Sequence, residues 1–233
     1  MSDRRHASFV TALAAGLAAA LVLTSTRHDV GTVLAQALPN PYRIVDGWAK
    51  LPGGQPMGAV GKADVDRDGR HIWAIVRCEP QEDQARFGDE CRDSRMHSVH
   101  RFAPDGTVAA SFGGGMFIWP HGIEVDPDGN IWVTDAVAAN RTPTGDMRGQ
   151  QVVKFSPDGR VLMRLGVAGV AGSGPDHFNS PSDVVVASNG DIFVADGHNE
   201  NGNNRVVKFS RDGRYIKEWG RTGYAPGEFR ALH

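Results

Sequence analysis

One four-strand pattern occurs three times in the chain, and this repeat limits the folds open to it. Each unit has four short runs rich in β-branched residues, separated by Asp-Gly or Asn-Gly turns that favour tight hairpins. The runs lie at 63–66, 72–76, 99–102 and 108–110, at 123–126, 131–135, 152–155 and 161–165, and at 184–186, 192–196, 206–209 and 215–219. A four-stranded sheet cannot bury both faces alone, so units of about 50–60 residues are expected to stack radially as blades of a β-propeller.

Composition agrees with this all-β class. The chain has 29 Gly and 13 Pro among 233 residues, which is typical of a turn-rich β protein. A β-sandwich is the alternative, but it does not explain why the same turn recurs at the same place in each unit. The formal net charge of −2 gives no reason to expect a nucleic-acid partner.

The N-terminal segment differs from the rest of the chain. Arg4 and Arg5 precede an apolar stretch, residues 9–23, which is shorter than the roughly 20 residues that span a membrane. Ala35-Gln-Ala37 then matches a signal-peptide cleavage site. The polar residues 24–29 separate this site from the apolar stretch by more than usual, so an uncleaved N-terminal anchor stays open as the alternative.

These features define the predicted domains and location. Residues 1–37 are expected to be a signal peptide or N-terminal anchor, and residues 38–233 to form the propeller. The protein is expected to be exported, periplasmic or secreted, and attached to a membrane only if the first segment is not cleaved. In such an oxidising compartment Cys78 and Cys91 predict a disulfide, which would stabilise the fold by about 3 kcal/mol.

Three residues share one position in the repeat. His121, Ser182 and His233 each stand four residues after a phenylalanine, at the start of the innermost strand, where side chains face the central channel. Two imidazoles there, with a third from a blade beyond the end of this chain, would form a three-histidine zinc site with an open position. A structural, hydrogen-bonded role is the alternative for His121.

The second strand of each blade returns to the same mouth of the channel. This places Arg77 and His198 near His121, and a guanidinium there suits an anionic substrate because it matches a carboxylate. A structural salt bridge is the alternative for Arg77, and a solvated loop position is the alternative for His198. Asp135 and Asp196 recur in the repeat and are expected to accept backbone hydrogen bonds within their blades.

The runs DGNIWVTD at 128–135 and VVKFSPDG at 152–159 resemble the NHL family of propellers. That family usually forms six blades, and three complete blades are visible here. Residues 42–48 could be an outer strand of another blade, and residues 226–229 begin a fourth. The resemblance therefore implies a ring that this chain does not close, and we expect a fragment or truncated product.

The run WPHGIEVDPDGNIWVTD at 119–135 is similar to the peptidyl-α-hydroxyglycine α-amidating lyase branch of these propellers, as are residues 181–184, 193–197 and 226–233. In that family a zinc ion held by three histidines polarises the substrate, an arginine binds it, and a tyrosine acts as base. The C–N bond then breaks to give a peptide amide and glyoxylate.

The resemblance assigns roles to individual residues. It implies His121 and His233 as zinc ligands and Arg77 as the substrate-binding arginine. His198 stands where the family has its tyrosine, and a histidine could serve as the base instead. Backbone carbonyls near Val60 and Ile123 match a structural calcium site of the family, whose remaining ligand is missing here.

The sequence is consistent with three functions, of which two are favoured. The first is a zinc-dependent lyase acting on a peptide or small-molecule substrate at the channel mouth. The second is a non-catalytic propeller of the cell envelope that binds a peptide, glycan or protein. The missing third histidine, the absent tyrosine and the open ring favour the second for this chain, which is expected to be inactive, and the shared register favours the first for an intact parent. A sugar-lactone hydrolase is a weaker third, because no carboxylate and asparagine set around calcium can be placed.

Overall fold

The computed structural model describes residues 40–78 and 90–233. The chain divides into two compact units, 1–44 and 45–233. In the first unit only residues 40–44 are described, and they form no helix or strand. The expected signal peptide or anchor lies outside the described residues, and none of the helices in the described part is long and apolar enough to cross a membrane.

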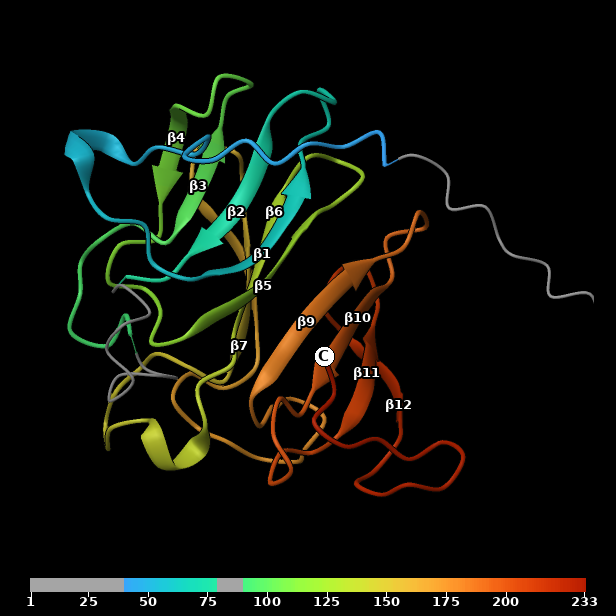
Figure 1. Ribbon diagram of the computed structural model, residues 1–233. Helices are drawn as coiled ribbons and strands as arrows, with labels where there is room; N and C mark the ends of the chain where they lie inside the picture. The colour runs from blue at the N-terminus through green and yellow to red at the C-terminus, as the bar shows by residue number, and fades with distance from the viewer. Residues whose placement is uncertain (1–39, 79–89) are drawn as a thin grey trace, which may run out of the picture. The chain divides into compact units, whose positions relative to one another are not determined.

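The second unit contains three four-stranded antiparallel sheets, each with its strands in sequence order (Figure 1). The sheets consist of β1 Val60–Val65, β2 Ile72–Val76, β3 Val99–Phe102 and β4 Val108–Phe112; β5 Pro120–Val125, β6 Ile131–Asp135, β7 Gln151–Phe155 and β8 Val161–Leu165; and β9 Pro181–Val186, β10 Ile192–Asp196, β11 Arg205–Phe209 and β12 Tyr215–Trp219. Two short 3₁₀ turns, Pro52–Gly54 and Ala139–Arg141, are the helical segments of the described residues. The predicted all-β class and the three four-stranded units are confirmed.

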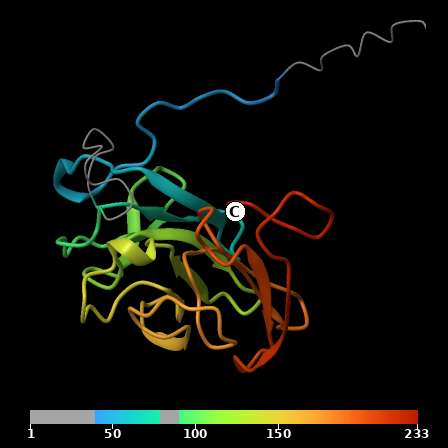
Figure 2. The same cartoon turned by 90° about the horizontal axis from the view of Figure 1, so that it is seen from below.

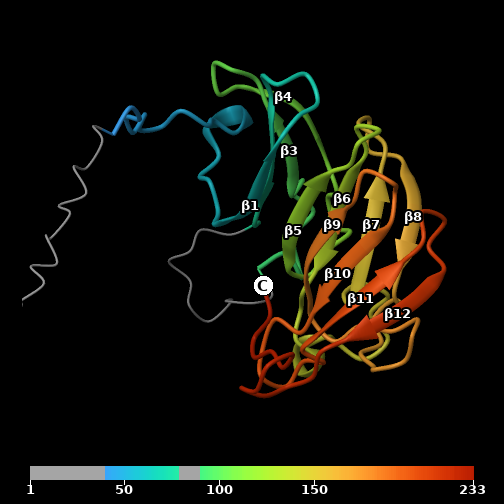
Figure 3. The same ribbon diagram turned by 90° about the vertical axis from the view of Figure 1, so that its right-hand side faces the viewer.

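The three sheets pack face to face, as blades do. One core cluster joins Trp73 and Phe112 of the first sheet to Ile123 and Phe155 of the second, and Phe112 and Phe155 have ring centroids 5.0 Å apart. A second cluster joins the second sheet to the third. Within the described residues no strand pairing returns from the third sheet to the first, so the ring stays open. Figure 2 shows the sheets from below, and Figure 3 shows the second and third sheets side by side.

The predicted equivalence of the second-strand ends, at Arg77, Ala136 and Gly197, is confirmed by one backbone hydrogen bond that recurs in every blade. The residue after the second strand donates its backbone N–H to the carbonyl that precedes the first strand. The three pairs are Arg77 to Ala59 at 2.9 Å, Ala136 to Trp119 at 3.1 Å and Gly197 to Ser180 at 3.1 Å. The end of each second strand therefore lies beside the start of the first strand, at one mouth of the channel.

The segment before the first blade does not form the outer strand that the sequence suggested for residues 42–48. Instead it crosses the β3–β4 turn, where the indole nitrogen of Trp48 donates to the carbonyl of Pro104 at 3.0 Å. Lys50 makes an isolated parallel bridge to Thr107. Gly106 permits this approach, because a Cβ there would lie 1.6 Å from the Trp48 carbonyl oxygen and its φ is +83°.

The start of the third blade is repeated near the end of the chain. Ala171 bridges to Phe178 before β9, and Thr222 bridges to Phe229 in the same parallel manner. The chain therefore begins the approach to another first strand at residues 226–229, as expected. Figure 3 shows that its C-terminal end lies beside β5.

Candidate metal and substrate site

Three histidines from separate parts of the chain meet at the channel mouth. His121 is the second residue of β5, His198 follows β10, and His233 is the last residue. The ring centroid of His198 lies 4.5 Å from that of His121 and 4.4 Å from that of His233. One ligand nitrogen from each of the three rings can be chosen so that all lie within 4.8 Å of one another.

This donor set fits a zinc ion. Neutral imidazole is a common zinc ligand, and Zn–N bonds of about 2.0–2.1 Å place tetrahedral nitrogens about 3.4 Å apart. The ligand nitrogens lie within 4.8 Å of one another, so a bound zinc ion would draw the three rings closer together. Three protein ligands also leave one position open, as catalytic zinc sites do.

Ser182 orients two of the histidines. Its backbone oxygen lies 2.9 Å from Nδ1 of His121, and because a carbonyl can only accept, Nδ1 carries the proton and Nε2 keeps the lone pair that a metal needs. Its hydroxyl donates to the backbone oxygen of Leu232 at 2.7 Å, which fixes the residue before His233. Ser182 itself is fully buried.

A glycine directs His198 toward the channel. Gly197 has a φ of +141°, and a Cβ there would lie 2.3 Å from the backbone nitrogen of Asn204. The chain can therefore reverse tightly after β10, and the backbone N–H of His198 donates to Ser180 at 2.9 Å. The imidazole is half-buried and packs edge-on against Trp119, with ring centroids 4.6 Å apart.

Burial favours the neutral imidazole at His121 and His198. It lowers the pKa of His121 to about 4, against the opposing hydrogen bond to Ser182. Burial, followed by the charges of His121, His233 and Arg77, lowers the pKa of His198 to about 3. Neutral imidazoles offer lone pairs to a metal, and a side chain with so low a pKa is a weak general base near pH 7.

Arg77 lies beside the histidines, as predicted. Its guanidinium carbon is 4.6 Å from the centroid of the Trp119 ring, and Nη1 is 3.7 Å from Oε1 of Glu90. Burial is the main cause that lowers the pKa of Arg77. Its buried Nε has no hydrogen-bond partner among the described residues. The predicted salt bridge and a substrate-binding role are therefore compatible, because Glu90 leaves part of the guanidinium unused.

The Cys78–Cys91 disulfide is present, with an S–S distance of 2.07 Å. It directly follows Arg77, and the backbone N–H of Cys91 donates to the carbonyl of Ile118 at 3.0 Å. The disulfide thus links the residue after Arg77 to Ile118, which precedes the first strand of the second blade.

The two recurrent aspartates hold the loops before the first strands, as expected. The carboxylate of Asp135 accepts hydrogen bonds from the backbone N–H groups of Ile118 and Trp119, both at 2.8 Å. Asp196 accepts from Asn179 at 2.7 Å in the third blade. Burial raises the pKa of Asp135 to about 6, and its two hydrogen bonds stabilise the backbone at Ile118 and Trp119.

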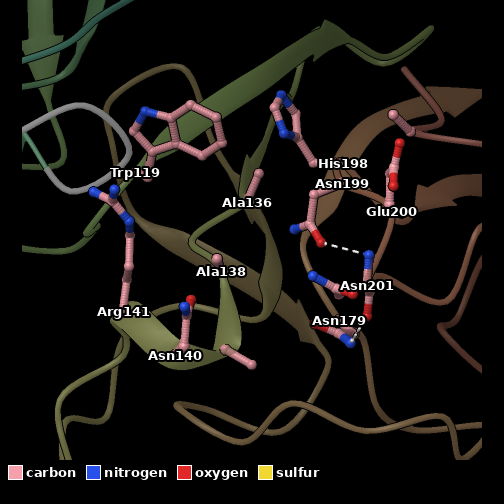
Figure 4. Close-up of a pocket in the computed structure, with 12 residues that line it drawn as sticks. Trp119, Ala136, Ala138, Asn140, Arg141, Asn179, His198, Asn199, Glu200 and Asn201 are labelled. Carbon is pink, nitrogen blue, oxygen red and sulfur yellow. Dashed lines mark hydrogen bonds between the residues drawn. The ribbon is translucent and has the colours of Figure 1, made fainter. Parts of the chain in front are cut away.

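A cavity of about 650 Å³ opens next to the histidine cluster (Figure 4). His198 belongs to both the cavity and the cluster, and Trp119, which packs against His198, also lines the cavity. The remaining lining residues are small or polar: Ala136, Ala138, Ala139, Asn140, Arg141, Asn179, Asn199, Glu200, Asn201 and Ala231. The repeat pattern gave no sign of this cavity, because its walls come from loops of different conformation in the second and third blades.

The calcium site stays a prediction. Val60 and Ile123 lie on β1 and β5, at the first and the fourth position of their strands. The carbonyls proposed as ligands therefore do not occupy equivalent positions of the two blades. In the described ranges, the histidine cluster is the one group of three or more metal-ligating side chains.

NHL repeats are recognised at residues 117–141 and 178–209. The chain is 31% identical over 212 residues to peptidyl-alpha-hydroxyglycine alpha-amidating lyase 1 of Drosophila melanogaster, which covers 86% of this chain and 36% of the relative. It is 32% identical over 218 residues to lyase 2 of the same organism, covering 88% and 47%. Among solved structures, virginiamycin B lyase from Staphylococcus aureus matches 69% of this chain and 40% of its own length, at 16% identity and a TM-score of 0.42. The chain thus spans less than half the length of these curated relatives.

Proposed function

We propose that this NHL-repeat chain, a homologue of the peptidyl-α-hydroxyglycine α-amidating lyases, carries a zinc-dependent site that cleaves peptidyl-α-hydroxyglycine to a peptide amide and glyoxylate. The observation that carries the proposal is the convergence of His121, His198 and His233 beside Arg77. The repeat register predicts a third ligand beyond the chain, whereas the geometry supports His198 in that role.

The residues around the site have separate roles. His121, His198 and His233 would hold the zinc ion, which would supply a Lewis acid for an oxygen of the substrate. Arg77 binds the substrate carboxylate through guanidinium N–H groups that Glu90 does not use. Ser182 holds His121 and the residue before His233 in place, and Trp119 packs against the rings of His121 and His198.

The proposal changes the role of His198. The resemblance offered it as a base in place of tyrosine, but its ring contacts both other histidines and its lowered pKa makes it a weak base. A role for His198 as a nitrogen ligand of the metal agrees with both its ring contacts and its lowered pKa. The disulfide at Cys78 and Cys91 supports an exported protein, since such bonds persist in oxidising compartments.

Metal analysis and product release test the proposal on the purified full chain. We expect close to one zinc per chain, and glyoxylate release from a short peptide that ends in α-hydroxyglycine. His121→Ala and His198→Ala should each lower zinc affinity by more than about 100-fold, beyond the effect of removing an outer-shell partner. His97→Ala is the matched control, because His97 is exposed and lies outside the cluster.

The outcomes separate the two candidate functions. Stoichiometric zinc without glyoxylate release would favour a non-catalytic binding propeller, for which the cavity beside Trp119 is the structural argument. Zinc binding that is unchanged by both His121→Ala and His198→Ala would contradict the proposed site.

A further inference from the structure

The cavity beside the histidine cluster has two chemically different parts. Its floor is apolar, built from Trp119 and Ala136, which are almost fully buried, together with Ala138. Its rim carries carboxamides, among them the exposed Asn140 and Asn201. A volume of about 650 Å³ lies within the roughly 300–1,000 Å³ range of small-ligand pockets.

The rim amides leave hydrogen-bonding groups for a ligand. Asn199 and Asn179 hold the loop, since Asn199 accepts from the Asn201 N–H at 2.9 Å and Asn179 donates to the Asn201 carbonyl at 2.9 Å. The side chains of Asn140 and Asn201 make no hydrogen bond within the described residues. A carboxamide can both donate and accept, so these two groups match the N–H and C=O of a peptide backbone.

The charge of the cavity wall is partly neutralised. Glu200 forms an ion pair with Arg230, with 2.8 Å between Oε1 and Nε, and this arginine lowers the pKa of Glu200. A carboxylate already paired in this way does not demand a cationic ligand. The alanine floor and the indole favour an uncharged, apolar side chain instead.

The position of the cavity identifies which part of the substrate it would take. His198 lines the cavity and touches both other histidines, while the guanidinium of Arg77, which does not line the cavity, lies over the Trp119 ring. A substrate whose carboxylate meets Arg77 and whose hydroxyl meets the cluster extends its preceding residues toward the cavity. We propose that this cavity binds the residue before the hydroxyglycine and selects a large apolar or aromatic side chain there, an inference that rests on the proposed function.

Glycine-extended peptides test this inference, because they lack the hydroxyl and are not cleaved. The zinc-loaded chain should bind acetyl-Phe-Gly about 10-fold more tightly than acetyl-Ala-Gly, as expected for burying most of a phenyl group. Acetyl-Asp-Gly should bind no better than acetyl-Ala-Gly. Titration calorimetry measures all three.

Two variants that fill the cavity make the test specific. Ala138→Phe should abolish the preference for Phe while leaving the zinc content unchanged, and Ala139→Trp, at an exposed position of the same wall, serves if the first variant folds poorly. Ala109→Phe is the matched control, since Ala109 is exposed on β4 outside the cavity. Equal affinity for the Phe and Ala peptides in the unmodified chain overturns the inference, as does a preference that both filled variants retain.

The proposed function can fail separately. If the chain prefers the Phe peptide but releases no glyoxylate from the corresponding hydroxyglycine peptide, the proposed binding site is supported and the proposed lyase activity is contradicted. If glyoxylate is released at equal kcat/KM whatever residue precedes the hydroxyglycine, the proposed lyase activity is supported and the proposed selectivity is contradicted.

Discussion

The hydroxyl of Ser182 donates to the backbone oxygen of Leu232 at 2.7 Å. This bond joins the first strand of the third blade to the end of the chain, 50 residues later. The same serine presents its own carbonyl to His121 at 2.9 Å. A single buried residue thus positions two of the three candidate ligands.

Replacing Ser182 by alanine should loosen His233 without moving His121, because only the hydroxyl is lost. We expect zinc affinity to fall by about 10- to 100-fold, as for other outer-shell changes, while the fold is retained. Ser182→Thr, which keeps the hydroxyl, is the control. An unchanged zinc affinity in the alanine variant would show that the bond to Leu232 does not position His233.

Gly122 makes the close approach of β5 and β9 possible. A Cβ there would lie 2.7 Å from both the Ser182 carbonyl and a carboxylate oxygen of Asp183, and that carboxylate also binds Lys62 at 2.7 Å. Gly122→Ala should therefore lower the free energy of unfolding by about 1–3 kcal/mol through overpacking. Urea denaturation measures the change.

Lys62→Met separates steric from ionic effects at the same place. It removes the ion pair without adding bulk near β5, and a partly exposed pair is worth about 0–1 kcal/mol. If Lys62→Met lowers the free energy of unfolding as much as Gly122→Ala does, the effect of Gly122→Ala is not explained by overpacking.

Arg77→Lys should weaken recognition of the substrate carboxylate while keeping the charge near Glu90. The lysine lacks the planar fork, and charge-assisted hydrogen bonds contribute about 1.5–3 kcal/mol each. We expect acetyl-Phe-Gly to bind more than about 10-fold more weakly. Acetyl-Phe-Gly-amide, which has no carboxylate, is the matched ligand, and an equal loss for it would argue for a purely structural Arg77.

Much of the site was predictable because the repeat carries its own register. The spacing of Phe117 to His121 and of Phe229 to His233 placed both histidines at one channel mouth, and counting along the second strand added Arg77. Antiparallel pairing fixes these positions locally, so no long-range information was needed.

The role of His198 was not predictable in the same way. Its direction depends on the reversal at Gly197, which is set by contact with Asn204 rather than by strand period. The cavity also escaped prediction, because it is the space left between Trp119 and the loop after β10. Such spaces depend on the packing of several loops, which no single repeat encodes.

Breaking the disulfide should affect both stability and the site. Cys78→Ala/Cys91→Ala should lower the free energy of unfolding by about 3 kcal/mol, given the short loop that the bond closes. Because Cys91 also pairs with Ile118, acetyl-Phe-Gly should bind more weakly. Reductant should lower the free energy of unfolding of the unmodified chain but should not change that of the double variant. Equal stability of the reduced and oxidised chains would contradict this expectation.

Acid should destabilise the metal-free chain through the histidine cluster. The pKa of His198 falls from 6.5 to about 3 on folding, and that of His121 to about 4. Between these values and pH 6.5 the unfolded chain binds more protons than the folded chain, so stability rises with pH. The stability that the two neutral imidazoles contribute is fully present above pH 6.5, and it is lost as the pH falls toward 4 for His121 and toward 3 for His198.

His198→Asn isolates this effect from other titrations. Asp135 has the opposite sign, because its raised pKa of about 6 stabilises the fold as the pH falls from 6, so the pH profile of the unmodified chain alone is not decisive. Removing His198 should reduce the slope of the unfolding free energy against pH between pH 6 and 4. The expected reduction is up to about 1.4 kcal/mol per pH unit, which corresponds to one proton. Urea denaturation of both metal-free chains at pH 7, 6, 5 and 4 measures it. Parallel profiles for the two chains would show that His198 is not buried beside the other histidines.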